Sequence, residues 1–395
     1  MSSNKIAIIG AGFSGLTLAW ALEKQGFEVE IFEARSTSGG MIQTTHQKVP
    51  AESAAHALLA SADVEELASD LNIEFVPAGF ISKSKWIFRG GPRKWPLTWK
   101  ETLRSMGIPR RPRPSQTVED WVLQHGSREL CDYVVEPALQ GIYGATSSQL
   151  SASLVFSGFF NKKQKTPQGQ WRGSVAPLNG MGELIQSLSK RFKIHYQSNT
   201  SIVDLQSAFQ YVVVATNLHD AGLLLQNLKP SLSQDLLKLP RVSLQSATIS
   251  YSGKSSRIRG FGCLFPQKEN FESLGVLFNS DLFAKRGQNS ETWIFRDHLD
   301  VSSPLLIKKI EQDRLRLDST PINIDFCEIH RWPQSLPLYG VELEEFLKTY
   351  FPSRNFGSRV TDQIYLTGNY LGGLGLSKIL NYNKRLAQVL KERVS

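Results

Sequence analysis

The amino-acid sequence predicts an α/β protein that combines a parallel-sheet domain with an antiparallel sheet and a helical insert. Two segments predict the parallel sheet, residues 5–33 and 363–393, because in each a strand runs through a glycine-rich turn into a helix. Between them, residues 217–354 alternate short apolar runs with turns, which is typical of antiparallel strands.

The composition is that of a folded globular protein. Of the 395 residues, 41% are hydrophobic and 21% are charged, which excludes a disordered or collagen-like chain. Only 3 cysteines occur, none in a CxxC pair, so we expect no disulfide framework and a cytoplasmic, reducing location. Residues 6–22 are apolar but interrupted by glycines, and they predict a strand, a turn and a helix rather than a membrane span.

The N-terminal segment has the spacing of a dinucleotide-binding unit. Residues 5–9 and 28–32 are predicted as buried strands, with a helix over residues 16–25 between them. Glu33 ends the second strand, where its carboxylate can accept hydrogen bonds from a ribose diol. The free N–H groups of the turn and of the helix start are predicted to bind a pyrophosphate, which assigns Gly10, Ala11, Gly12, Phe13, Ser14 and Gly15 to the cofactor.

A second glycine pair follows the acid, and a nicotinamide site does not need it. The segment from Glu33 to Thr44 resembles the EA-x(n)-GG-x-I-x-T signature of the amine oxidase-like flavoproteins. That resemblance implies FAD rather than NAD, with these residues at the cofactor: Glu33, Ala34, Arg35, Gly39, Gly40 and Met41. Cys327 lies well before the C-terminal glycine turn, so we expect the flavin to be bound non-covalently.

Near the C-terminus a strand over residues 363–367 runs into four closely spaced glycines, and a helix then extends to about Arg393. Such a turn presents backbone N–H groups to an anionic or electron-rich ligand edge. The segment resembles the flavin-contacting stretch of the protoporphyrinogen oxidases. This resemblance adds Gly368, Asn369, Leu374, Gly375 and Leu376 to the cofactor residues.

Other segments resemble the same protoporphyrinogen and coproporphyrinogen oxidase family in the same order. They cover residues 136–144 with 150–151, 179–184, 260–266, 274–283, and 330–332 with 337–339. Where the family has E-x-GP, this chain has Glu52-Ser53-Ala54-Ala55-His56, which implies cofactor contacts by Ala54, Ala55 and His56. The resemblance also implies that Val203 lies beside the adenine through its backbone.

The resemblance implies a three-part architecture. The FAD-binding domain is expected to be discontinuous and to comprise residues 1–82, 174–216 and 355–395. A helical insert is expected over residues 83–173, and the antiparallel substrate domain over residues 217–354.

The implied activity is the FAD-dependent oxidation of protoporphyrinogen IX or coproporphyrinogen III to the porphyrin in heme biosynthesis. Six electrons leave the substrate in three flavin cycles, and molecular oxygen is the expected acceptor. An amine oxidase or a carotenoid desaturase on the same scaffold is an alternative, as is a flavin- or porphyrin-binding protein without turnover. No catalytic side chain is assigned, because the cofactor carries the electron chemistry. The 7 histidines show no metal-site spacing, so no metal is expected.

A porphyrinogen is a large apolar disc with carboxylate tails, which requires apolar walls and a cation at the mouth of the pocket. Lys85 aligns with a family arginine that holds a propionate, although a solvated surface lysine explains it equally well. Arg89 and Arg93 are further candidates for the carboxylate, and Tyr143 for the pocket wall or for core packing.

The positive charge is concentrated in one segment. Residues 83–113 hold ten Lys or Arg and one acid, Glu101, so ten minus one equals the formal net charge of +9 of the whole chain. Aromatic residues lie among these cations, a mixture that is typical of peripheral binding to the anionic inner face of a membrane, and a solvated charged surface is the alternative. No nucleic-acid module accompanies the charge, so nucleic acid is not an expected partner.

Overall fold

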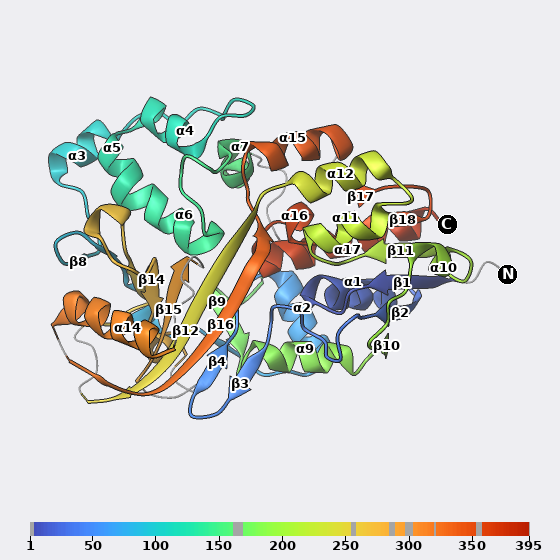
Figure 1. Cartoon of the computed structure of the whole chain (residues 1–395), viewed down its shortest axis with the longest axis horizontal. Helices are drawn as coiled ribbons and strands as arrows, with labels where there is room; N and C mark the ends of the chain where they lie inside the picture. The colour runs from blue at the N-terminus through green and yellow to red at the C-terminus, as the bar shows by residue number, and fades with distance from the viewer. Residues whose placement is uncertain are drawn as a thin grey trace.

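The structure combines two large sheets that lie at opposite ends of the molecule (Figure 1). The computed structural model describes residues 4–160, 169–253, 258–283, 289–296, 303–319, 321–352 and 358–394. A mostly parallel sheet lies near both chain ends, at the right of Figure 1. A seven-stranded sheet forms the left-hand end, with the helices of residues 99–160 above it.

Strands from three distant parts of the chain form the first sheet. In spatial order they are β10 (Lys193–His195), β2 (Glu28–Phe32), β1 (Lys5–Ile9), β11 (Tyr211–Val214), β18 (Ile364–Leu366) and β17 (Ser358–Arg359). All neighbours are parallel except β17 and β18. The central strands are continuous apolar runs because both faces of the sheet are covered. The predicted α/β class with a Rossmann-like domain is confirmed.

Alternate residues of β1 enter two separate cores, one on each face of this sheet. Ile6 and Ile8 pack with α1 (Phe13–Lys24), α2 (Ala62–Leu71), α9 (Met181–Ser189) and α17 (Leu376–Glu392). Ala7 and Ile9 share the second core with α10 (Ile202–Gln206), α11 (Leu218–Leu225), α12 (Pro230–Lys238), α15 (Val341–Tyr350) and two helices of the insert, α4 (Val118–His125) and α6 (Glu136–Tyr143). The insert is therefore anchored to the parallel sheet through a shared core.

Two small sheets adjoin the first domain. β3 (Thr44–His46) and β4 (Pro50–Glu52) form a hairpin. β5 (Leu58–Leu59), β9 (Ser174–Pro177) and β6 (Phe75–Pro77) form a three-stranded antiparallel sheet. Because β9 lies between the other two strands, the chain returns to its N-terminal part directly after the insert.

The second sheet has one face closed by a helix and one face turned toward the insert. Its order is β16 (Asn323–Pro337), β12 (Arg241–Ser252), β15 (Ser290–Arg296), β14 (Gly275–Leu277), β13 (Gly262–Leu264), β7 (Lys85–Phe88) and β8 (Pro92–Arg93). Only the β13–β7 pair is parallel. Ala247, Trp293 and Phe295 point to a third core that α14 (Ser303–Asp318) covers. Three short helices complete this half: η1 (Phe80–Lys83), η4 (Gln267–Glu269) and α13 (Asn279–Leu282).

The structure shifts the edges of the expected domains. Residues 85–93 were expected to open the helical insert but form the last two strands of the seven-stranded sheet, because Lys85 and Ile87 alternate with the inward-packed Trp86 and Phe88. The helices of the insert start later: α3 (Trp99–Arg104), α4, α5 (Arg128–Leu130), the π-helix η2 (Cys131–Val135), α6, α7 (Ala152–Val155) and α8 (Ser157–Phe160). Helices α11, α12 and α15 pack on the parallel sheet, although residues 217–354 were expected to build only the substrate sheet.

One buried amide joins the two ends of the chain. Asn383 of α17 is fully buried, and its Nδ2 donates to the Ser14 carbonyl and to Thr17 Oγ1 of α1, at 2.8 Å each. Its Oδ1 accepts a hydrogen bond of 2.5 Å from Thr367 Oγ1, directly after β18. The first glycine-rich turn, the last strand and the last helix therefore have fixed positions relative to one another.

We expect Asn383→Leu to lower the free energy of unfolding by about 2 kcal/mol, because the buried hydroxyl of Thr367 loses its acceptor. Asn381→Leu is the matched control, since Asn381 is only half-buried and makes a single hydrogen bond, to Asp63. Urea unfolding of both variants measures the difference. Equal stability of the two variants would show that the amide does not hold this junction.

Candidate functional site

The first glycine-rich turn lies between β1 and α1 and combines two crowded glycines with one open glycine. A Cβ at Gly15 would lie 1.9 Å from the Gly10 carbonyl oxygen, and Gly10 itself has a φ of +109°. A Cβ at Gly12 would meet no heavy atom within 4 Å. The backbone at Gly12 is thus accessible to a ligand, and the first N–H groups of α1 point toward the same space.

Glu33 ends β2 directly beside this turn, as expected. Its Oε2 accepts a hydrogen bond of 2.7 Å from the Ala11 N–H, and its Oε1 accepts one of 2.9 Å from the Arg35 N–H. The carboxylate is nearly buried, yet each oxygen keeps a second lone pair for a ligand hydroxyl. Glu33 therefore fixes the shape of the turn in addition to its predicted ribose contact.

The second glycine pair packs against the first turn. The Gly39 N–H donates to the Ala11 carbonyl at 2.8 Å, and a Cβ at Gly40 would lie 3.5 Å from the Gly12 Cα. Gly39 has a φ of +112° and Gly40 a φ of +58°, which favour glycine. Met41 follows, so the sequence-predicted residues from both turns are adjacent in space.

The segment after β4 is tied to the glycine pair through Ser53. Its Oγ donates to the Met41 carbonyl at 2.7 Å and accepts from the Gln43 N–H at 2.9 Å. Ala54, Ala55 and His56 therefore follow beside the second turn. Trp332 of β16 donates from Nε1 to the Ser53 carbonyl at 2.7 Å, which connects the seven-stranded sheet to the same place. Sequence reasoning found the motif that contains Trp332 but not this contact.

The C-terminal glycine turn reaches the same region from β18. Gly368 and Gly373 have φ values of +151° and +99°, with the short α16 (Asn369–Gly372) between them. Gly375 precedes α17, whose first residue Leu376 packs against the first core, and the partly buried Leu374 packs against the second. The Asn369 carbonyl accepts a hydrogen bond from the Tyr339 hydroxyl, a partner that the sequence did not identify.

Val203, which was predicted to lie beside the adenine through its backbone, is part of the helix α10, and 57% of its surface is exposed. Earlier in the same segment, the backbone N–H groups of Ser198 and Gln197 donate to the carbonyls of Glu33 and Arg35, at 3.0 and 3.1 Å. These two residues are further candidates for the adenine end.

The arrangement fits a dinucleotide with a pyrophosphate. The open backbone at Gly12, the helix start behind it and the adjoining Gly39–Gly40 turn form a cradle that a side chain would fill. Among the described residues, no group of His, Cys, Asp and Glu is arranged to hold a metal ion. Nor does the described part of the chain contain a helix that is long and apolar enough to cross a membrane.

Next to this cradle lies the face of the seven-stranded sheet that α6 covers, called the α6 face below. The register of β12 with β15 and β16 places two rows of residues on it: Arg296, Leu244 and Trp332, then Ile294, Ser246 and His330. A Cβ at Gly141 would lie 3.2 Å from Leu264, and one at Gly144 would lie 2.8 Å from Leu244, so α6 runs directly over this face.

Tyr143 connects the α6 face to the C-terminal turn. Its ring lies 5.2 Å from the ring of Tyr339, whose hydroxyl contacts Asn369. The side chain is buried, and burial raises the pKa of its hydroxyl. Tyr143 therefore packs in the wall between the insert and the predicted flavin turn, and nothing in the contacts makes it a proton donor.

The basic candidates have different surroundings. Lys85 is exposed on the same sheet face, with its Nζ 5.3 Å from the centre of the Phe261 ring. Arg89 is already engaged: its guanidinium forms two hydrogen bonds to Glu101, of 2.7 and 2.9 Å, and lies over the Tyr133 ring. That ion pair would have to break before Arg89 could bind a substrate. Arg93 is exposed on the edge strand and donates to the Arg89 carbonyl.

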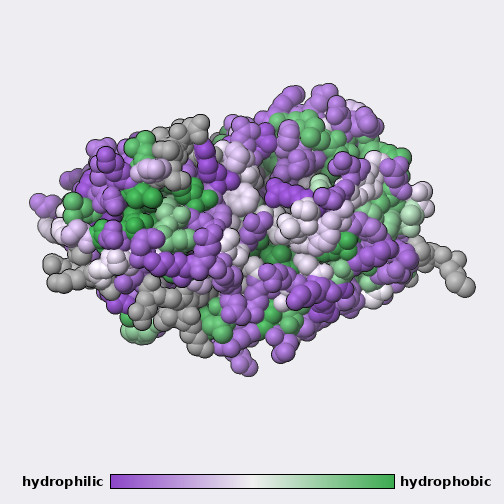
Figure 2. Space-filling model, turned by 60° about the horizontal axis from the view of Figure 1, so that its bottom comes forward, coloured by the Kyte–Doolittle hydropathy of each residue, from purple (hydrophilic) through white to green (hydrophobic). Residues whose placement is uncertain are grey.

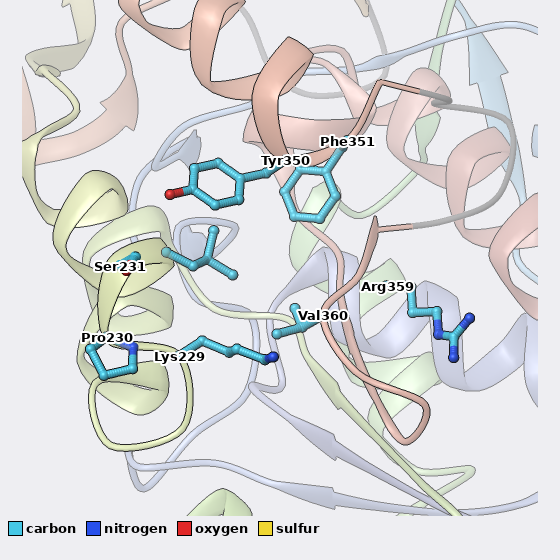
Figure 3. Close-up of a pocket in the computed structure, with 8 residues that line it drawn as sticks. Lys229, Pro230, Ser231, Tyr350, Phe351, Arg359 and Val360 are labelled. Carbon is cyan, nitrogen blue, oxygen red and sulfur yellow. The ribbon is translucent and has the colours of Figure 1, made fainter.

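A surface cavity of about 320 Å³ lies elsewhere, between α12, α15 and β17 (Figure 3). Lys229, Pro230, Ser231, Leu232, Tyr350, Phe351, Arg359 and Val360 line it. None of them is a predicted cofactor or substrate residue, and the cavity does not include the glycine turns. We therefore place the functional site at the turns and the α6 face.

Comparison with known proteins agrees with this geometry. A family model described as an NAD(P)-binding Rossmann-like domain matches residues 8–71. The chain is 23% identical to protoporphyrinogen oxidase 1, chloroplastic, of Arabidopsis thaliana, over 69% of this chain and 63% of that protein. It is 21% identical to the mitochondrial protoporphyrinogen oxidase of Nicotiana tabacum, over 96% of this chain and 93% of that protein.

Among solved structures, one from Exiguobacterium sp. 255-15 assigned to the protoporphyrinogen oxidases has a TM-score of 0.77 and 18% identity, and covers 100% of both chains. Cyclohexylamine oxidase from Brevibacterium oxydans IH-35A has a TM-score of 0.70 and 13% identity, over 99% of each chain. Reduced UDP-galactopyranose mutase has a TM-score of 0.75 and 13% identity, over 98% of this chain and 95% of that one. At these identities the structures establish a shared fold.

Gly12 and Gly15 give opposite predictions. Gly12→Val is expected to fold normally, because its side chain enters open space, but to purify without flavin, because that space is the cradle. Gly15→Ala is expected to lose about 1–3 kcal/mol of folding stability through the collision with Gly10. Flavin absorbance per chain and thermal unfolding measure both effects. A Gly12→Val protein with full flavin would contradict the placement of the pyrophosphate.

Glu101 gives a prediction for acid pH. The hydrogen bonds from Arg89 hold its pKa at about 2, below the ordinary value of 4.5. A lowered pKa stabilises the folded chain above pH 4.5, and this stabilisation is lost as the pH falls toward 2. The Tm difference between wild type and Glu101→Gln should therefore narrow between pH 6 and pH 3. The control is Glu392→Gln at an exposed position, for which the Tm difference from wild type should not change with pH. A Tm difference between wild type and Glu101→Gln that stays constant from pH 6 to pH 3 would refute the ion pair.

Proposed function

We propose that the chain is a protoporphyrinogen oxidase-like, FAD-type oxidoreductase that oxidises a porphyrinogen to the porphyrin. One observation carries this proposal: both glycine-rich ends of the chain meet beside the α6 face, through Trp332 with Ser53 and Tyr339 with Asn369. A redox cofactor held by the turns and a large apolar substrate held by the α6 face would then be in contact.

FAD, when bound, supplies the acceptance of hydrogen from the substrate and the return of electrons to an acceptor, for which we propose molecular oxygen. The chain supplies position. The α1 start and the Gly39–Gly40 turn hold the phosphates, and Glu33 holds the ribose. The Asn369 backbone, fixed by Tyr339, and residues 54–56, fixed by Ser53, border the space expected for the ring system.

The α6 face suits an apolar disc. Leu244, Ile294, Leu264 and Trp332 give it apolar walls, and α6 excludes water from above. His330 is half-buried, and burial outweighs the neighbouring Glu328 in lowering its pKa below the ordinary value, which favours the neutral ring. A porphyrinogen is itself neutral apart from its carboxylates, so a disc can lie against His330 without burying an unpaired charge there. Lys85 remains our proposed contact for one of those carboxylates.

The prediction is that purified, FAD-loaded protein converts freshly reduced protoporphyrinogen IX or coproporphyrinogen III to a fluorescent porphyrin under oxygen. Consumption of about three oxygen molecules per porphyrin is expected if each flavin cycle removes two electrons. The Gly12→Val protein is the control for non-enzymatic oxidation.

Other outcomes of that assay favour other functions. Turnover of a primary amine or of a polyene, with none of either porphyrinogen, would make the protein an amine oxidase or a carotenoid desaturase. The structural similarity to cyclohexylamine oxidase is the observation that favours the amine oxidase alternative. Tight porphyrin binding without turnover of any of these substrates would indicate a carrier that has lost its activity.

We also propose peripheral binding of the insert to an anionic membrane. No residue of α3 is buried, and large apolar side chains project between the cations: Trp95 (51% exposed), Trp99 (69%), Leu103 (58%), Met106 (72%) and Ile108 (85%). Figure 2 shows, on another face, hydrophobic groups interrupting the hydrophilic surface at the left-hand end of the molecule. Each basic residue near an anionic bilayer contributes about 1 kcal/mol of attraction.

Flotation with anionic liposomes tests this. The wild type is expected to float with anionic liposomes at low salt and to stay at the bottom with neutral liposomes. The double variant Trp99→Ser/Leu103→Ser is expected to bind the anionic liposomes at least tenfold less. Leu59→Ser, which removes a comparably exposed side chain outside the insert, is the matched control. A wild-type protein that stays at the bottom at low salt would refute membrane binding.

A further inference from the structure

Arg296 is a half-buried cation on the α6 face that pairs with no carboxylate among the residues the structure describes. It ends β15, and the amide of Gln267, with its oxygen turned toward the guanidinium, lies 2.6 and 2.8 Å from the two terminal nitrogens. No carboxylate lies within 4 Å of it among the residues that the structure describes. Burial outweighs the attraction of Glu136 and lowers the pKa of Arg296 below its ordinary value.

Two other arginines in this half of the molecule pair directly with carboxylates. Arg314 is buried with Glu291 and Asp318, and Arg259 pairs with Asp281. Within the described part of the chain, the half-buried guanidinium of Arg296 meets a neutral amide instead, and a bound carboxylate would supply the missing compensation through two parallel hydrogen bonds.

Gln140 lies on the side of α6 that covers this face, and its amide has no partner. It is 1% exposed, and neither its Nε2 nor its Oε1 makes a hydrogen bond. Glu136, one helical turn away, is already engaged, because its Oε2 accepts from the Ser147 N–H at 3.2 Å and from the Ser147 hydroxyl at 2.7 Å. A buried amide without partners is costly, so its neighbourhood is built for a polar ligand atom.

The register connects these two groups. Gly144, one turn beyond Gln140, packs on Leu244, and Leu244 pairs with Arg296 on one side and with Trp332 on the other. Arg296 is therefore two strand spacings, about 10 Å, from the strand whose Trp332 bonds the cofactor segment. Lys85 lies on the same face in β7, three strands away from β15 in the direction opposite to β16.

We propose that Arg296 and Gln140 form a subsite for a substrate carboxylate, in which the guanidinium binds both oxygens and the Gln140 amide nitrogen donates to one of them. The inference rests on the proposed function, since it places one acidic tail of the porphyrinogen at this subsite and leaves the disc against Leu244 and Trp332. The subsite sets specificity for acidic over esterified tetrapyrroles.

Binding of protoporphyrin IX and of its dimethyl ester to the FAD-loaded protein tests the subsite, with quenching of tryptophan fluorescence as the readout. The wild type is expected to bind the diacid at least tenfold more tightly than the ester. Arg296→Gln should lose most of that preference, Arg296→Lys should keep part of it, and the exposed Arg128→Gln control should keep all of it. Gln140→Leu leaves the charge of Arg296 in place, so it should weaken the binding of the diacid alone, by about threefold or more, and leave the binding of the ester unchanged.

The outcomes separate this subsite from the proposed function. A diacid preference that survives Arg296→Gln and Gln140→Leu would overturn the subsite and leave the porphyrinogen oxidase proposal standing. Equal weakening of diacid and ester by Arg296→Gln would also overturn it, because that result indicates a structural role. A wild-type protein that neither binds nor oxidises any tetrapyrrole would overturn the proposed function and the subsite with it.

Discussion

The junction between the two ends of the chain is the constraint on which the rest depends. Asn383 bonds Ser14, Thr17 and Thr367 with no polar atom of its amide group left over. Because it is fully buried, water cannot replace any of these partners, and the first and last glycine turns cannot move apart independently. A site assembled from residues more than 350 positions apart in sequence is held in place by this kind of contact.

Much of the cofactor cradle could be predicted from sequence because its requirements are local. Gly10 and Gly15 are crowded by backbone that lies a few residues away in the fold, and Gly12 is open, as the spacing of a strand, a turn and a helix demands. Glu33 also follows from that spacing. The family pattern does not reveal that the segment of Val203 folds as a helix with this side chain exposed.

The substrate side could not be predicted in the same way, because its contacts are long-range. Arg89 and Glu101 lie 12 positions apart and neutralise each other, but no periodicity in the basic segment indicates that pairing. Arg296 drew no attention in the sequence, since its significance lies in its half-burial and in the missing carboxylate, which depend on the register of three strands. Strand register decides which cations face a site and which face solvent.

The most direct test of the account is the stoichiometry of the cofactor. Purified wild-type protein should take up one FAD per chain, show the flavin absorbance bands, and release intact FAD on heat denaturation, as expected for non-covalent binding. Well-folded protein that remains colourless after incubation with excess FAD would contradict the convergence of the two turns on one dinucleotide, and with it every function proposed here.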